Sequence, residues 1–372
     1  MCVHAPPNAA GASEFEERRG AYVMSLTNRK VFAHARIVAR PSKFSGVRGA
    51  DRTYRAPVKP ELGSLPLSET PEPPTQRDVT AGGVRLRVAE AGSGPCVVLL
   101  HGLFVDHRIW DGVVRGMNQE FHLVAPDLPG FGESEKPATS RFPYTVEAFA
   151  EAIAGLYAGL QIGRAALVGH GLGAAIALTL AARHPELVAH LVLIDPMLEP
   201  ERPLLENRLA GLPLIGNLVF KQLVGKATFR AYFRERLLSP SANVAPARVD
   251  AFYESFNTPA ARGSALATLR ATSDPRPVLA QSIRVRSPTL LLWGRHDELY
   301  PARFGQRLAR EIGGAHFELV DAGHAVPEEQ PEETARLISR FLTAPPSSQP
   351  RKPVDFGMRA PKRARVPRKR SR

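Results

Sequence analysis

The chain is poor in cysteine and in long apolar runs, and both shortages exclude classes of protein. Only Cys2 and Cys96 occur among 372 residues, so neither a disulfide framework nor a cysteine-rich zinc cluster is expected. No apolar run approaches the roughly 18 residues that a membrane-spanning helix needs. The first residues lack the charged, apolar and cleavable order of a secretory signal. We therefore expect a cytoplasmic protein without a membrane span; organellar targeting stays open, because residues 24–59 are rich in arginine and contain one acid.

The centre of the chain has no excess charge of either sign. Residues 76–345 contain 28 Lys+Arg and 28 Asp+Glu, so the formal net charge of +13 belongs to the two ends. Residues 346–372 hold ten basic residues and one acid, and we expect this tail to be disordered and solvated. Nonspecific contact of residues 361–372 with nucleic acid or anionic lipid is the alternative. Residues 1–75, with clusters of Pro and Gly, are expected to be a disordered extension.

From residue 76 onward, short apolar runs alternate with segments of helical spacing. This alternation predicts an α/β fold with a mostly parallel, doubly wound sheet that is covered on both faces. The strand-like runs are an opening hairpin at 79–89 and further strands at 96–101, 121–126, 165–168, 187–194, 289–293 and 316–320. The helix-like segments are 145–160, 172–183, 302–312 and 331–342.

The alternation breaks at residues 198–280, which hold amphipathic segments and no strand-like run. We interpret this block as a helical cap inserted between two core segments, 76–197 and 281–345. In open α/β sheets ligands bind outside the carboxyl ends of the strands, so the cap is expected to cover that edge. Apolar cap residues are the candidates for a ligand-binding surface, although packing of the cap on the core explains their spacing equally well. They are Phe220, Phe229 and Tyr232, together with Leu214 and Phe252.

One turn lacks the residue that its surroundings call for. Residues 167–175 read Leu-Val-Gly-His-Gly-Leu-Gly-Ala-Ala, between an apolar strand and a helix of small residues. A Gly-x-Ser-x-Gly segment in that setting forms a nucleophile elbow. Gly169 and Gly173 stand at the flanking positions, but Gly171 stands where the serine is expected. Residues 165–175 contain no Ser, Thr, Cys, Asp or Glu, so no neighbour supplies a nucleophile.

Four further segments accompany this turn in a characteristic order. They are His-Gly-Leu-Phe at 101–104, Asp-Leu-Pro-Gly-Phe-Gly at 127–132, Trp-Gly-Arg-His-Asp at 293–297 followed by Pro301, and Ala-Gly-His at 322–324 followed by Glu328 and Pro331. With them, residues 77–343 resemble the α/β-hydrolases that carry a helical cap. The resemblance implies a degenerate triad of Gly171, Asp297 and His324. It also implies an oxyanion hole built from the backbone N–H of Leu172 and that of Leu103 or Phe104.

Each of these residues has a plainer interpretation. Asp297 is suited to capping the helix that begins near Pro301, and Glu298 is the nearest competing acid. His101 and His170 are expected to pack rather than react. No metal or cofactor is expected, because no carboxylate or cysteine stands at ligand-like spacing around residues 101–107.

Two functions follow from an intact Asp297–His324 pair beside a missing nucleophile. The first is a noncatalytic or weakly active protein that binds a small apolar ligand, or a protein partner, under the cap. The second is a hydrolase or lyase of small ester or carbonyl compounds in which His324 acts as a general base on water. The glycine favours the first function, and the retained pair favours the second.

Overall fold

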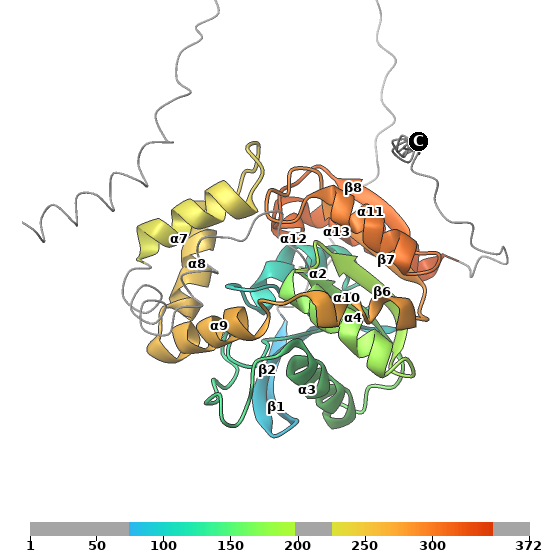
Figure 1. Cartoon of the computed structure of the whole chain (residues 1–372), viewed down its shortest axis with the longest axis horizontal. Coiled ribbons are helices and arrows are strands. Elements are labelled where there is room, and N and C mark those ends of the chain that lie inside the picture. Colours follow the sequence, from blue (N-terminus) through green and yellow to red (C-terminus); the bar gives the residue numbers. More distant parts are fainter. Residues whose placement is uncertain (1–73, 198–224, 345–372) are drawn as a thin grey trace, which may run out of the picture. The chain divides into compact units, whose positions relative to one another are not determined.

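A computed structural model describes residues 74–197 and 225–344 of the chain (Figure 1). Its centre is one eight-stranded sheet in the order β1-β2-β4-β3-β5-β6-β7-β8. The hairpin β1–β2 pairs antiparallel, β2 pairs antiparallel with β4, and every other neighbouring pair is parallel. The strands are β1 Thr75–Ala81, β2 Val84–Ala91, β3 Cys96–Leu100, β4 His122–Pro126, β5 Ala165–His170, β6 Val188–Ile194, β7 Thr289–Gly294 and β8 His316–Val320.

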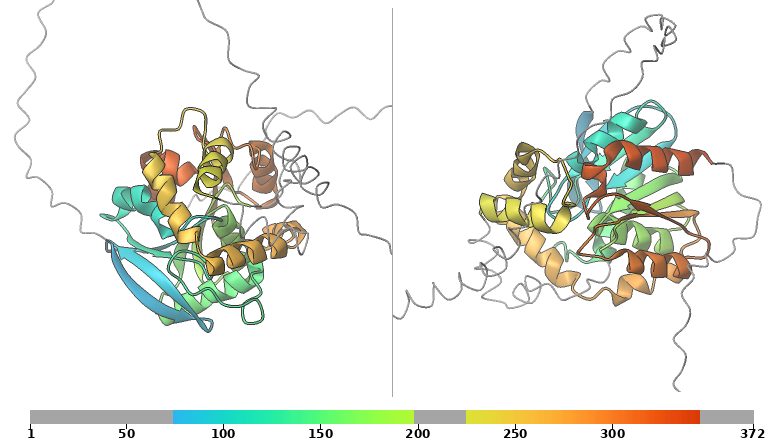
Figure 2. Two further views of the ribbon diagram at one scale, coloured as in Figure 1. Left: turned by 90° about the vertical axis from the view of Figure 1, so that its left-hand side faces the viewer. Right: turned by 90° about the horizontal axis from the view of Figure 1, so that it is seen from above.

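Helices cover both faces of this sheet. Figure 2 shows α13 on one side of the sheet and α11 on the other. The helix α13 packs against α2, whereas α3 packs against α4 and α4 against β5 and β6. The predicted fold class is confirmed. The helices that flank the sheet are α2 Asp111–Met117, α3 Val146–Gly159, α4 Leu172–Arg183, α11 Ala302–Glu311 and α13 Pro331–Thr343, with the short turns η1 His107–Trp110, α10 Arg276–Leu279, η4 Ser282–Arg284 and α12 Val326–Glu329.

The central strands are apolar throughout because both of their faces are covered. Every residue of β5 and β7 is buried, and so are the last four residues of β3. Such continuous burial is typical of parallel strands between two helical layers. The carboxyl ends of β3, β5, β6, β7 and β8 therefore lie along one edge, where the loops that follow them converge.

The described residues of the block at 198–280 are helical, and the division of the chain into core and cap stays a prediction. Pro246 and Pro259 stand in the first turns of α8 and α9, where a missing N–H costs no helical hydrogen bond. Residues 198–224 lie outside the described residues, and with them Leu214 and Phe220. Residues 1–73 of the predicted extension 1–75 and the basic tail also lie outside them, whereas Thr75 already belongs to β1. The described cap elements are α7 Lys226–Tyr232, the π-helical turn η3 Phe233–Leu237, α8 Pro246–Phe256 and α9 Pro259–Ala271.

Across the part of the chain that the structure describes, no helix is both long and apolar enough to cross a membrane.

Candidate active site

The turn between β5 and α4 has the backbone geometry that a nucleophile elbow requires. Gly171 lies at φ +55° and ψ −113°, a conformation that residues with a side chain adopt only at a cost. The two flanking glycines are needed for close packing. A Cβ on Gly169 would collide with the backbone of Gly173, and a Cβ on Gly173 would collide with the backbone of Leu100. The turn is thus narrow on both sides, and its tip is Gly171.

His324 and Asp297 meet beside this tip, from the loops that follow β8 and β7. The Nδ1 atom of His324 lies 2.8 Å from Oδ2 of Asp297, and both side chains are buried. The other oxygen of Asp297 accepts hydrogen bonds from the backbone N–H groups of Leu299 and Tyr300 at 2.7 and 2.9 Å. Since Nδ1 donates to the carboxylate, the basic nitrogen of a neutral His324 is Nε2. A Cβ placed on Gly171 would lie 3.3 Å from this Nε2.

Asp297 therefore does two things at once. One carboxylate oxygen caps the turn that leads to α11, as the plainer interpretation holds, and the other orients His324. The competing acid, Glu298, has 71% of its side-chain surface exposed and lies 3.9 Å from Arg236. The geometry thus brings Asp297, and not Glu298, to the histidine.

The loop after β3 closes the other side of the site. The Cα of Gly102 lies 3.6 Å from the position of a Cβ on Gly171, and Phe104 holds a strained φ of +65°. His101 fixes this loop, because its Nδ1 donates to the carbonyl of Gly102 at 2.7 Å and its Nε2 accepts from the N–H of Leu128 at 2.9 Å. Burial lowers the pKa of His101, so the ring is neutral and structural.

The residues implied for the oxyanion hole belong to the two segments that meet at Gly171. Leu172 is the first residue of α4, and the N–H groups of a first helical turn have no intrahelical acceptor. Leu103 and Phe104 are half-buried in the facing loop. Backbone N–H groups of this kind can stabilise a developing negative charge on oxygen, so the oxyanion hole stays a prediction for these residues.

His170 packs against the loop that follows β8, residues 321–325, which carries His324 and which we call the histidine loop. Its Nε2 donates to the backbone carbonyl of His324 at 2.8 Å, and the two rings lie 5.0 Å apart. Burial, followed by the nearby His324, lowers the pKa of His170 to about 3, so the ring stays neutral at physiological pH. A neutral, buried ring that donates to a carbonyl positions the backbone of His324.

Two acids near the site, the buried Asp195 and the half-buried Glu329, were not predicted. Asp195 follows β6 at φ +42°, and its Oδ1 accepts from the N–H of Gly294 at 2.9 Å. Burial raises the pKa of Asp195, and the charge of Asp297 raises it further. Glu329 accepts from the N–H groups of Gly323 and Ser239 at 2.8 and 3.0 Å, and burial raises its pKa as well. In the sequence, the feature that points to Asp195 as a site residue is its position directly after a predicted strand, at the sheet edge where ligands bind.

The cap touches the histidine loop directly. The N–H of Ala325 donates to the carbonyl of Leu237 at 2.9 Å, and a Cβ on Gly323 would collide with the backbone of Leu237 to Ser239. Glu329 completes this contact by accepting hydrogen bonds from both sides. The position of the imidazole is therefore coupled to that of the cap.

Aromatic rings of the cap contact the loop that follows β3, residues 101–106, which we call the oxyanion loop after its predicted role. Phe104 makes edge-to-face contacts with Tyr232 at 6.0 Å and with Phe256 at 5.5 Å between ring centroids. Phe229, 3% exposed, stacks on Phe256 inside the cap. Of the predicted ligand-binding candidates, Tyr232 thus reaches the oxyanion loop, whereas Phe229 belongs to the cap's own core. A narrow cavity next to Phe104 is lined by Val105, Phe131, Gly132, Phe252, Ser255, Phe256 and Ala261.

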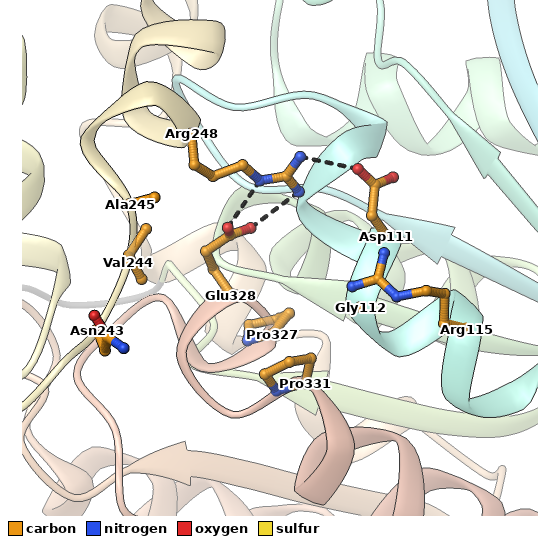
Figure 3. A pocket seen from close by; sticks show the side chains of 10 residues that line it. All are labelled: Asp111, Gly112, Arg115, Asn243, Val244, Ala245, Arg248, Pro327, Glu328 and Pro331. Carbon is orange, nitrogen blue, oxygen red and sulfur yellow. Dashed lines mark hydrogen bonds and ion pairs between the residues drawn. The ribbon is translucent and has the colours of Figure 1, made fainter.

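A larger pocket of about 330 Å³ lies at the cap–core junction and contains none of the predicted site residues (Figure 3). Arg248 of α8 forms one wall and binds Glu328 through two nitrogens at 2.8 and 3.1 Å and Asp111 at 2.9 Å. It also donates to the carbonyl of Arg108, and its guanidinium lies 5.1 Å from the ring centroid of Phe252. The charges of this wall are paired with each other, so Arg248 fastens the cap to the core.

We expect Arg248→Ala to loosen this junction. The substitution leaves two carboxylates without their partner, and a lost hydrogen bond to a charged group typically costs about 1.5–3 kcal/mol. We expect a loss of about 2–3 kcal/mol in the free energy of unfolding, measured in urea, and faster proteolysis within the cap. Arg234→Ala, at an exposed site on the same cap, is the control. Equal stability of the two variants would show that Arg248 does not hold the cap.

A second group of ionisable side chains lies behind the oxyanion loop. Asp106, His107 and Asp127 bring ligand-type atoms within 4.8 Å of one another, a cluster that spacing in the sequence did not indicate. These groups satisfy each other, because His107 donates its backbone N–H and Nδ1–H to Asp127 at 2.8 Å, while Arg108 binds Asp106. We interpret the cluster as a structural network that anchors the loop.

The comparisons with known proteins agree with this geometry. The sequence model of the alpha/beta hydrolase fold family matches residues 95–331, and the chain belongs to that family. It is 32% identical to 2-(acetamidomethylene)succinate hydrolase of Mesorhizobium japonicum, over 72% of this chain and 95% of that protein. It is 28% identical to 2-hydroxy-6-oxo-2,4-heptadienoate hydrolase of Pseudomonas putida, over 72% and 96%. A thermophilic esterase from Thermogutta terrifontis has a similar structure, with a TM-score of 0.61 and 27% identity over 72% of this chain and 98% of that one.

Proposed function

We propose that this protein binds a small apolar ester or carbonyl compound beneath its cap and does not form an acyl-enzyme. The observation that carries the proposal is at Gly171. His324 directs its Nε2 at the point where a side chain of residue 171 would begin, 3.3 Å away, and residue 171 has no side chain. The glycine thus occupies the position of the nucleophile in a degenerate triad with Asp297 and His324.

Magnitudes separate binding from covalent catalysis. Loss of a triad serine typically lowers turnover by about 10⁶-fold. An oxyanion hole and a binding pocket alone retain about 10³–10⁴-fold over water. We therefore expect a site with backbone donors near Leu172 and Phe104 but without a nucleophile to bind a carbonyl compound and polarise its C=O bond. The bound compound should dissociate much faster than it is converted. The rings of Phe104, Tyr232 and Phe256 supply the apolar surface for such a ligand.

The similar proteins favour a small molecule as the ligand. The relatives from Mesorhizobium japonicum and Pseudomonas putida are named as hydrolases of small carbonyl-containing compounds. Their coverage of this chain includes the cap as well as the core, which supports a ligand of similar size in the same place.

An assay of esters tests the proposal. Wild type and His324→Ala are compared on p-nitrophenyl butyrate, and binding of butyrophenone, a ketone that has no ester bond, is followed by calorimetry. We expect equal hydrolysis by the two proteins, and binding that Phe256→Ala weakens about tenfold or more. Failure of wild type to bind the ketone or the ester would contradict ligand binding at this site.

The second candidate function is hydrolysis without a covalent intermediate. The observation that favours it is the 2.8 Å hydrogen bond between His324 and Asp297, which keeps Nε2 basic and oriented. In this reaction Nε2 removes a proton from water as the water oxygen attacks the carbonyl, and the negative charge passes to the carbonyl oxygen at the backbone donors. A wild-type rate about 10²–10⁴-fold above that of His324→Ala would establish this function in place of simple binding.

A further inference from the structure

Two aspartates lie buried side by side beneath the histidine. Asp195 has no exposed surface, and the side chain of Asp297 has none either. One carboxylate oxygen from each lies within 4.8 Å of the other and of a ring nitrogen of His324. Neighbouring β6 and β7 bring the two residues together, because each follows the end of its strand. Two ionised carboxylates so close in an apolar interior repel each other strongly.

The hydrogen-bond donors are divided unequally between the two carboxyl groups. Asp297 has three donors, namely the N–H groups of Leu299 and Tyr300 and Nδ1 of His324. Asp195 receives one, the N–H of Gly294 on its Oδ1. Its Oδ2 is fully buried and has no donor among the described residues. An unsatisfied buried oxygen costs about 1–3 kcal/mol, more if it is charged, so the structure calls for a partner at this atom.

We propose that Asp195 is a neutral carboxylic acid at physiological pH and that its Oδ2–H donates to the carboxylate of Asp297. A proton at this position resolves both problems, since it removes one of the two negative charges and turns the unsatisfied oxygen into a donor. Asp195 is then a positioning residue. It holds the Asp297 carboxylate in the orientation that fixes the Nδ1–H tautomer of His324. The inference goes beyond the proposed function, because it holds whether the site binds or hydrolyses its ligand.

The surroundings of Asp195 support a bound proton. Burial is the largest cause of its raised pKa, and the charges of Asp297 and, more weakly, Glu329 act in the same direction. The N–H of Gly294 opposes them by stabilising the ionised form. His324 is the other titratable group at the cluster, and its Nδ1 is engaged by Asp297. The strained φ of +42° at Asp195 is consistent with a side chain held by a specific partner.

Such a proton makes stability depend on pH in a defined direction. The folded protein keeps a proton that the unfolded chain releases above the ordinary aspartate pKa of about 3.9. Stability from this group is thus complete below that pH and is lost as the pH rises toward the folded-state pKa. Asp195→Asn keeps one donor and one acceptor at the same positions but does not titrate. The unfolding constant of wild type relative to this variant is expected to rise about tenfold per pH unit from about pH 5 upward.

Urea unfolding of wild type, Asp195→Asn and the exposed-site control Glu235→Gln between pH 5 and 8 tests the proposal. Glu235 is exposed on the cap, so its substitution should give a ratio that does not change with pH. A constant ratio for Asp195→Asn would overturn the proposal, because it would mean that Asp195 is ionised in the folded state. Zinc ion that stabilises wild type but not Asp195→Asn would also overturn it, by placing a cation between the carboxylates.

A measurement on the wild-type protein keeps the proposal testable if Asp195→Asn does not fold. Protein labelled with ¹³C at the aspartate carboxyl carbons should show the C=O stretching band of a protonated carboxylic acid in the infrared at pH 7. The label should shift this band, and because glutamate carries no label, the shift excludes Glu329 as the source. Without this band the proposal fails. The band should persist in His324→Ala, so the outcome does not depend on the dyad function proposed for the site.

Discussion

Gly171→Ser should turn this protein into an esterase. A Cβ at this position lies 3.3 Å from Nε2 of His324 and 3.6 Å from Cα of Gly102, so the hydroxyl would lie between the base and the oxyanion loop. Removal of a triad serine typically lowers turnover by about 10⁶-fold, so adding the missing serine can raise turnover by up to that factor. We expect kcat/KM on p-nitrophenyl butyrate to rise by about 10⁴–10⁶-fold over wild type. A fluorophosphonate should label the introduced serine.

The same substitution is expected to reduce stability. A side chain at φ +55° and ψ −113° costs on the order of 1–3 kcal/mol, and the imidazole must move by a few tenths of an ångström to admit the Cβ. Gly171→Ala is the matched control, because it introduces the same strain and no hydroxyl. Both variants should lose similar free energy of unfolding, and only the serine variant should hydrolyse the ester. A folded Gly171→Ser that neither labels nor hydrolyses would show that the oxyanion donors or His324 are misplaced for catalysis.

The fold was predictable wherever local chemistry and tertiary packing agree. The helix α4 was predicted at its observed bounds, Leu172–Arg183, because glycine precedes it and small apolar residues fill it. The helix α2, Asp111–Met117, was missed because it has seven residues and two glycines, which weaken any helical pattern. In the cap, α9 was not predicted as a separate helix, since its buried residues are mostly small and give little periodic signal.

The site was predictable to the extent that it depends on the order of segments. Gly171, Asp297 and His324 each follow a strand that apolar runs reveal, and parallel strands bring their carboxyl ends to one edge. Asp195 follows such a strand as well. Its role next to Asp297 could not be predicted, because it depends on β6 lying next to β7 and on which hydrogen-bond donors reach each carboxylate oxygen. Glu329 likewise gains its role from a cap segment ninety positions away. Such unequal sharing of donors is a property of three-dimensional packing.

Asp297→Asn tests whether the carboxylate controls the histidine tautomer. The amide oxygen can still accept from the N–H groups of Leu299 and Tyr300, so the turn before α11 keeps its hydrogen bonds. The amide nitrogen then faces Nδ1 of His324, and because both atoms cannot donate, the proton moves to Nε2. A protonated Nε2 no longer accepts a proton from a hydroxyl at residue 171. In the Gly171→Ser background we expect kcat/KM to fall by about 10⁴-fold, as such a change does in serine hydrolases.

The readouts for Asp297→Asn separate a tautomer change from unfolding. Imidazole ¹⁵N shifts should report the proton on Nε2 of His324, while urea unfolding should show far less loss than Asp297→Ala, which leaves the three donors of the carboxylate unsatisfied. Removing the charge of Asp297 also removes one cause of the raised pKa of Asp195, so the pH dependence assigned to Asp195 should move to lower pH. If Asp297→Asn left the ester activity of Gly171→Ser unchanged, His324 would not need Asp297 to act as a base.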